Sequence, residues 1–188
     1  MSVYIAARDL AGIVPIGTHQ FIIIDKLPSP HPNGMLGGKI IAPKNLGNGK
    51  LGYVIGAHNR GNLEAMYFEK SDYEATLEYF DKKRVHFFKS DFDTEIIKVT
   101  FPDINEKIAV VKILRIVNDY SLNQLTDKIA YPSAGFGFNS NSWAQTVIEL
   151  AGGVVQSDLK GFDISNKKRI PKTYFMPVCP SKPRQKIN

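Results

Sequence analysis

One run of apolar residues restricts the folds open to this 188-residue chain more than any other feature. Residues 17–27, GTHQFIIIDKL, place Phe21 directly before three consecutive β-branched isoleucines. Successive side chains of a strand point to opposite faces, so a continuous apolar run is typical of a strand that is buried on both faces. The run therefore predicts a central strand of a sheet.

The flanking segments predict further strands. Residues 3–7 are short and apolar, and residues 28–38 are a loop dense in Pro and Gly. We expect residues 39–43 and 50–59 to form a hairpin across the turn KNLGNG. Residues 85–101 have a strand-like or mixed pattern.

Three helices are predicted, at residues 71–83, 105–118 and 143–151. Ser71 is the expected N-cap of the first, with Glu74 at the spacing of a capping box. Gly152 and Gly153 are expected to end the last helix. Strands and helices in this order indicate an α+β domain with a mainly antiparallel sheet.

The net charge of +6 is concentrated at the end of the chain. Residues 164–188 contain no acidic side chain and seven basic ones, namely Lys167, Lys168, Arg169, Lys172, Lys182, Arg184 and Lys186. We predict one folded domain over residues 1–165 and a basic, Pro- and Lys-rich tail over residues 166–188. The tail is either a solvated end or a contact for an anionic partner, such as nucleic acid, a membrane surface or an acidic glycan.

Several classes of protein are disfavoured. No apolar run approaches the roughly 20 residues of a membrane-spanning helix, so no transmembrane segment is predicted. The N-terminus lacks the pattern of a secretory signal, so we expect a cytoplasmic protein as synthesised, or one exported by a route independent of such a signal. A lone cysteine, Cys179, excludes an internal disulfide framework and a cysteine-rich zinc site, and we interpret it as an incidental thiol.

Cofactor and metal sites are not predicted either. The segment GFGFNS lacks the third glycine of a dinucleotide-binding loop, and no P-loop is present. No H-x-x-x-H or H-E-x-x-H spacing occurs. Asp91, Asp93 and Glu95 alternate along one segment, which is more typical of a solvated strand face than of a calcium loop.

The start of the last helix is the first candidate site. Asn139, Ser140, Asn141 and Ser142 stand where the free N–H groups of a first helical turn need partners, so they are plausible caps. The same N–H groups stabilise negative charge. A serine at this place could therefore attack a carbonyl group while the N–H groups hold the oxyanion, provided that a base activates it.

The histidines supply candidate bases. His19 begins the central strand, at the boundary between core and solvent, and His58 ends a strand and could face a cleft. His31 lies between two prolines and is interpreted as a loop residue. His86 stands beside Phe87 and Phe88 and is interpreted as a packing residue.

The order of these two features resembles that of the circularly permuted papain-like hydrolases, the NlpC-type group that includes lecithin–retinol acyltransferase-like proteins. A histidine strand (GTHQFIII) precedes a polar helix start (GFNSNSWAQTVIEL) that is similar to the N-C-x-x-F or N-C-N-x-F of that group, with Trp143 at the aromatic position. The segments YVIGAHNRGNL and GFDISNKKRIPKTYF are similar to domains at the ends of bacterial polymorphic toxins and secreted effectors.

The resemblance implies a role for each candidate residue. His19 would be the base, and Ser140 would stand at the position of the nucleophilic cysteine. His58 would orient His19, and Asn139, Asn141 and Ser142 would line the substrate or oxyanion site. Ser142 could instead be the reactive hydroxyl, with Ser140 as the cap.

The resemblance also implies a function. We expect a cofactor-free hydrolase of an amide, peptide or ester bond, acting on a peptide, peptidoglycan or acyl substrate as a bacterial effector or toxin, with an immunity or carrier protein as partner. Serine in place of cysteine is compatible with a serine hydrolase, an engineered substitution or a non-catalytic relative. The alternative is a degenerate papain-like binding module that docks through its basic tail.

Overall fold

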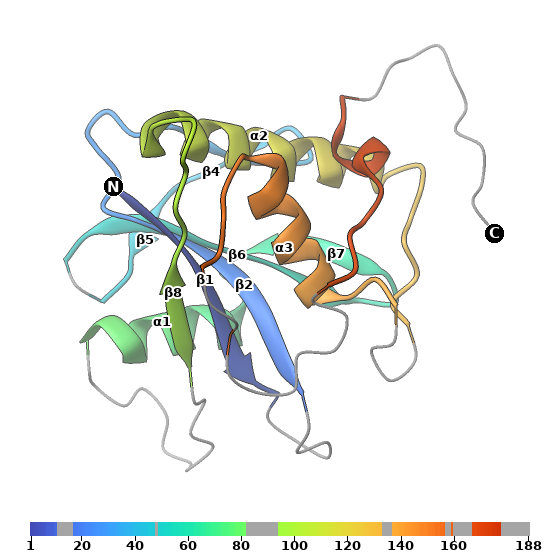
Figure 1. The fold of residues 1–188 in the computed structure, drawn as a ribbon, viewed down its shortest axis with the longest axis horizontal. Helices are drawn as coiled ribbons and strands as arrows, with labels where there is room; N and C mark the ends of the chain where they lie inside the picture. Colours follow the sequence, from blue (N-terminus) through green and yellow to red (C-terminus); the bar gives the residue numbers. More distant parts are fainter. Residues whose placement is uncertain are drawn as a thin grey trace.

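The computed structural model describes residues 1–10, 17–47, 49–81, 94–132, 137–156, 159 and 167–177. Six strands form one antiparallel sheet (Figure 1). Their order is β5 (Lys44–Asn45), β6 (Leu51–Asn59), β2 (Thr18–Asp25), β1 (Ser2–Asp9) and β8 (Glu95–Lys98), and β7 (Leu63–Tyr67) also pairs with β6. The predicted α+β class with a mainly antiparallel sheet is confirmed.

Strand β2 lies inside the sheet, between β1 and β6, and all eight of its residues are buried. Its side chains alternate between two separate cores. Ile22 and Ile24 pack in the larger core, whereas Phe21 and Ile23 pack in the smaller one. The prediction of a central strand that is buried on both faces is therefore confirmed.

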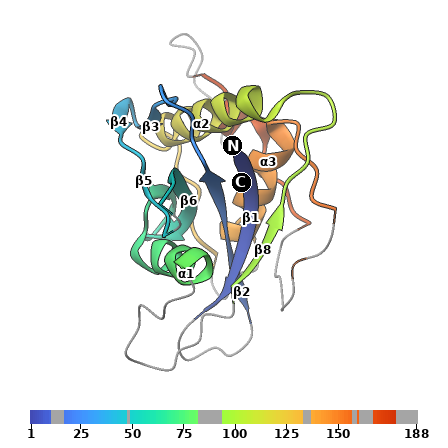
Figure 2. The same cartoon turned by 90° about the vertical axis from the view of Figure 1, so that its left-hand side faces the viewer.

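The helices cover opposite faces of this sheet, as the two views in Figures 1 and 2 show. Helices α2 (Glu106–Asn123) and α3 (Ser140–Leu150) contribute to the larger core. Helix α1 (Lys70–Asp81) lies on the other face and contributes Ala75 to the smaller core. This division decides which side chains can meet.

Two predicted local features are wrong. Residues 39–41 form β4 (Lys39–Ile41), which pairs with β3 (Gly34–Leu36) across a tight turn, and β5 is the segment that pairs with the start of β6. Gly37 and Gly38 have φ of 57° and 80°, which is the backbone that a two-residue hairpin turn requires. Ser71 does not cap α1, because the Glu69 carboxylate accepts from the N–H of Ser71 at 2.8 Å.

Helices α2 and α3 have asparagine N-caps, Asn105 and Asn139, and Gly152 follows α3 with φ of 89°. Residues 167–177 lie in the predicted tail, yet Ile170 and Phe175 are buried in the larger core, and Phe175 stacks on Tyr120 of α2. Residues 178–188, with Cys179 and the last three basic side chains, lie outside the described residues.

Among the described residues, none of the helices combines the length and the apolar character needed to cross a membrane.

Candidate functional site

A buried carboxylate on α1 is the centre of the candidate site. Asp72 lies in the first turn of α1, and none of its surface is exposed to solvent. The sheet strands beneath it present three side chains that reach this carboxylate: Arg8 from β1, His19 from β2 and His58 from β6.

The register of the sheet brings these side chains together. Arg8 and His19 are direct cross-strand partners, and His19 stacks on Phe21, which packs in the core beneath α1. The His19 and His58 rings are 4.4 Å apart between centroids. Segments that are far apart in the chain therefore converge on one face of the sheet.

The contacts divide between the two carboxylate oxygens. Arg8 donates from Nε to Oδ1 of Asp72 at 2.8 Å. The Nε2 atoms of His19 and His58 lie 3.1 Å and 2.9 Å from Oδ2. Two imidazole nitrogens thus point at one oxygen atom, while the other oxygen is held by a cation.

The electrostatics of the cluster follow from its burial. Burial lowers the pKa of His19, and the Asp72 carboxylate opposes this effect without reversing it. Burial alone would raise the pKa of Asp72, but His19, His58 and Arg8 outweigh it and hold that pKa far below its usual range. At neutral pH the cluster therefore contains an ionised Asp72, a neutral His19 and a cationic Arg8.

Gly56 of β6 leaves room beside the cluster. A Cβ atom at this position would lie 2.6 Å from Oδ2 of Asp72, 2.9 Å from Nε2 of His58 and 3.3 Å from Nε2 of His19. Because Gly56 has no side chain, the space that its Cβ atom would occupy is bordered by all three polar atoms.

The structure brings together His19 and His58, but it does not bring His19 to Ser140. The His19 ring points to the α1 face, whereas Ser140 begins α3 on the opposite face. The Ser140 hydroxyl donates to Asn141 Oδ1 at 3.2 Å and also bonds the hydroxyl group of Tyr131. The predicted pair of base and nucleophile is therefore not formed.

The polar residues at the start of α3 act as caps. The Asn139 side chain accepts from the N–H groups of Asn141 and Ser142, and the Ser142 hydroxyl accepts from the N–H of Asn139, which completes a capping box. Asn141 Oδ1 accepts from the backbone N–H of Gln20 at 2.9 Å and so ties α3 to β2. Capping therefore accounts for these contacts of Asn139 and Ser142, whereas Asn141 links the helix to the sheet.

Replacing Asn139 with alanine is expected to lower the free energy of unfolding by about 1 kcal/mol, because two N–H groups of α3 lose their acceptor. Urea denaturation followed by circular dichroism measures this loss. Asn105→Ala, at the equivalent position of α2, is the matched control and should cost a similar amount. An Asn139 variant as stable as the wild type would contradict the capping role.

Sequence reasoning found both histidines but missed Asp72, Arg8 and Gly56. No local motif marks them, since Asp72 lies 53 residues from His19 and 14 residues from His58. His86, Asp91 and Asp93 lie outside the described residues, and His31 contributes nothing to the cluster.

Comparisons of this chain with protein-family models, curated proteins and solved structures find no match. The resemblance to permuted papain-like hydrolases therefore stays a prediction that rests on the sequence segments alone.

Proposed function

We propose that His19, His58 and Asp72 bind a divalent first-row transition metal ion, and that the chain is a metal-dependent hydrolase. The observation that carries this proposal is the convergence of two imidazole nitrogens and one carboxylate oxygen on the space beside Gly56. These ligand atoms all lie within 4.8 Å of one another.

The distances suit one ion. Zinc lies about 2.0–2.2 Å from imidazole nitrogen and carboxylate oxygen, so two such ligands in tetrahedral or octahedral geometry are separated by about 3.0–3.5 Å. The Asp72 oxygen is 3.1 Å from one imidazole nitrogen and 2.9 Å from the other. A small inward or outward adjustment of the three side chains gives metal-ligand distances.

The protonation states also suit a metal. Metal ligands must be deprotonated, and the pKa directions of His19 and Asp72 leave a neutral imidazole and a carboxylate at neutral pH. Arg8 fixes the second carboxylate oxygen, which is the kind of outer contact that orients a ligating carboxylate. Two histidines with one carboxylate form a donor set of catalytic metal sites, which keep a coordination position open.

The proposed reaction is hydrolysis of an amide, peptide or ester bond. A metal ion held by His19, His58 and Asp72 would lower the pKa of a bound water and polarise the carbonyl group of the substrate. Water would add across the carbon–nitrogen or carbon–oxygen bond, so that the acyl group gains the hydroxyl group and the leaving group gains the proton. The His58 side chain is 12% exposed and is the most exposed of the three proposed ligands.

This proposal keeps the reaction class that the resemblance to papain-like hydrolases implies, and changes the group that activates the nucleophile. A serine mechanism would need Ser140 next to His19, and these side chains lie on different faces of the sheet. The proposed substrates remain a peptide, a peptidoglycan peptide or an acyl ester.

The test is zinc binding by the full chain after EDTA treatment and dialysis. We expect one Zn²⁺ per chain in isothermal titration calorimetry, and a higher melting temperature with zinc. His19→Ala and His58→Ala should each abolish the zinc-dependent rise in melting temperature. His31→Ala, which removes a histidine outside the cluster, is the matched control and should bind zinc normally.

Cobalt(II) gives a second readout, because its visible absorption reports the number and geometry of its ligands. We expect this spectrum to change in His19→Ala and to be unchanged in His31→Ala. Unchanged zinc stoichiometry and affinity in both the His19 and His58 variants would overturn the metal site. Normal zinc binding without metal-dependent cleavage of amide or ester probes would overturn the hydrolase alone.

A further inference from the structure

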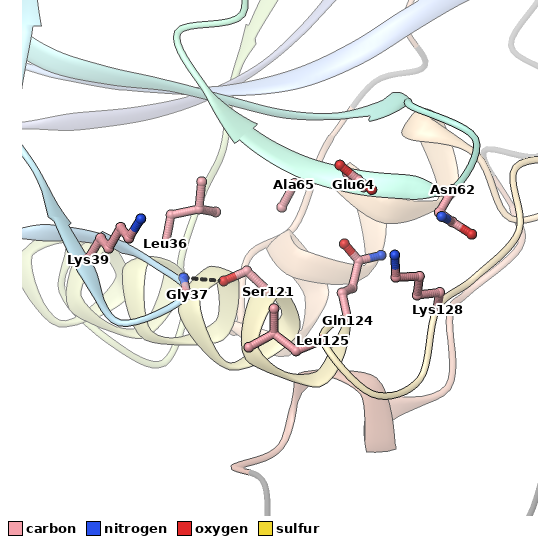
Figure 3. A pocket seen from close by; sticks show the side chains of 10 residues that line it. All are labelled: Leu36, Gly37, Lys39, Asn62, Glu64, Ala65, Ser121, Gln124, Leu125 and Lys128. Atoms are coloured by element: carbon pink, nitrogen blue, oxygen red, sulfur yellow. Dashed lines mark hydrogen bonds between the residues drawn. The ribbon is translucent and has the colours of Figure 1, made fainter.

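A cavity of about 460 Å³ lies at the outer edge of β7, apart from the histidine cluster (Figure 3). The turn between β3 and β4 forms one wall, β7 forms another, and the C-terminal part of α2 forms a third. This volume falls within the range of about 300–1,000 Å³ that is typical of ligand sites.

The backbone of Ala65 faces this cavity. Phe68, the residue after β7, donates from its N–H to the carbonyl of Val54, so the even-numbered residues of β7 exchange hydrogen bonds with β6. The N–H of Leu63 instead bonds the carbonyl of Ile129, outside the sheet. By this alternation, the N–H and C=O of Ala65 also point away from β6.

The outward backbone groups of Leu63 have partners, whereas, among the described residues, those of Ala65 do not. The Leu63 carbonyl accepts from the Tyr120 hydroxyl and from the Gln124 side chain. Within the described part of the chain, nothing bonds the outward N–H or C=O of Ala65, although Ala65 is 7% exposed. The N–H and C=O of Ala65 can therefore pair with a ligand that supplies both an acceptor and a donor.

Two lysines stand at opposite ends of the cavity. In Figure 3, Lys39 extends from the β3–β4 side and Lys128 from beyond α2, and both amines point toward the lining residues between them. Among the described residues neither lysine forms an ion pair. Glu64 is the acidic residue of the lining, so the lining carries a net positive charge.

Apolar side chains border the same space. Leu36 and Leu125 line the cavity, and Leu125 is 71% exposed. Ile40, which follows Lys39 in β4, is 69% exposed. Exposed apolar groups and cations beside a strand edge with an available N–H and C=O, here those of Ala65, are typical of a surface that receives another chain.

We propose that this cavity binds an extended, acidic peptide segment of a partner protein, which adds a strand to the outer edge of β7. The segment's backbone bonds the N–H and C=O of Ala65, and its carboxylates pair with Lys39 and Lys128. A small anion would pair with the lysines, but it would not pair with both the N–H and the C=O of Ala65. This peptide site does not depend on the metal centre.

The experiment measures fluorescence polarisation of a labelled peptide, acetyl-Asp-Val-Glu-Val-Asp-Val-amide, with the full chain. We expect saturable binding, and at least tenfold weaker binding by the double variant Lys39→Ala/Lys128→Ala. A peptide with N-methyl groups on its central glutamate and on the valine that follows it should also bind at least tenfold more weakly, because neither of its edges can then pair fully as a strand.

The basic tail could also attract an acidic peptide, so it supplies the control. Lys167→Ala/Lys168→Ala removes two exposed lysines and should leave binding within twofold of the wild type. Equal weakening in both double variants, or no binding at all, would overturn the site. Undiminished binding of the N-methylated peptide would show that charge attraction alone holds the peptide. It would therefore overturn the proposed strand addition.

Discussion

Replacing Asp72 with alanine is expected to lower the free energy of unfolding by about 3–5 kcal/mol, because it removes the carboxylate that pairs with the buried cation of Arg8. Arg8 is 7% exposed and His19 is 4% exposed, so neither can recover its hydrogen bonds from bulk solvent. Since domains are typically stable by about 5–15 kcal/mol, this is a large share of the total. Urea denaturation of the metal-free protein measures the loss.

Two controls distinguish the loss of the Asp72 contacts from the general effect of removing an aspartate. Asp119→Ala removes a helix carboxylate that pairs with an exposed arginine, Arg115, and should cost less than about 1 kcal/mol. Asp72→Asn keeps the shape and one acceptor oxygen, so it should destabilise less than alanine. A loss below about 1 kcal/mol for Asp72→Ala would show that the cluster contributes little to folding.

The sequence predicted β2 well because its apolar run has a single physical explanation, burial on both faces. It predicted the last two helices from their apolar spacing, and the pair Gly152 and Gly153 marked the end of α3. Their bounds were less well predicted, since α2 continues to Asn123 and α3 already begins at Ser140. The prediction of a loop over residues 28–38 missed β3, which pairs with β4. The two glycines of the hairpin turn lie in a segment rich in Pro and Gly, so their composition did not distinguish a turn from a loop.

The face of α1 could not be predicted from apolar spacing. Tyr73, Leu77 and Phe80 recur at helical spacing and suggest the buried side, yet the fully buried positions include Asp72, Ala75 and Thr76. Small side chains let the helix approach the sheet, and the larger ones pack around the contact. A carboxylate in the first turn ordinarily reads as a favourable charge at a solvated helix start, so nothing local marks Asp72 as buried.

The pairing of His19 with Ser140 failed for a similar reason. Chain order predicts that a strand and a helix are neighbours, but not which face of the strand a residue occupies. Gln20, one residue from His19, accepts from Gln145 of α3 at 2.9 Å, whereas His19 faces α1. A shift of one residue along a strand moves a side chain to the other face, and motif order does not resolve that shift.

Gly56→Ala is expected to abolish zinc binding, since the added methyl group would occupy the space that the three ligand atoms share. The added methyl group would lie 2.6 Å from Oδ2 of Asp72, so either the Asp72 carboxylate or helix α1 must move. We expect the metal-free variant to lose about 1–3 kcal/mol of stability through overpacking. Calorimetric zinc titration and urea denaturation in EDTA measure the two effects separately.

A double-mutant cycle tests whether the methyl group acts on the cluster itself. His58→Ala removes one of the three atoms that the methyl would meet, at 2.9 Å, so Gly56→Ala should cost less stability in that background than in the wild type. Additive losses would mean that the methyl group disturbs β6 elsewhere. Wild-type zinc affinity in Gly56→Ala would place the metal away from the space beside Gly56, and the site would then have to be assigned to other ligands.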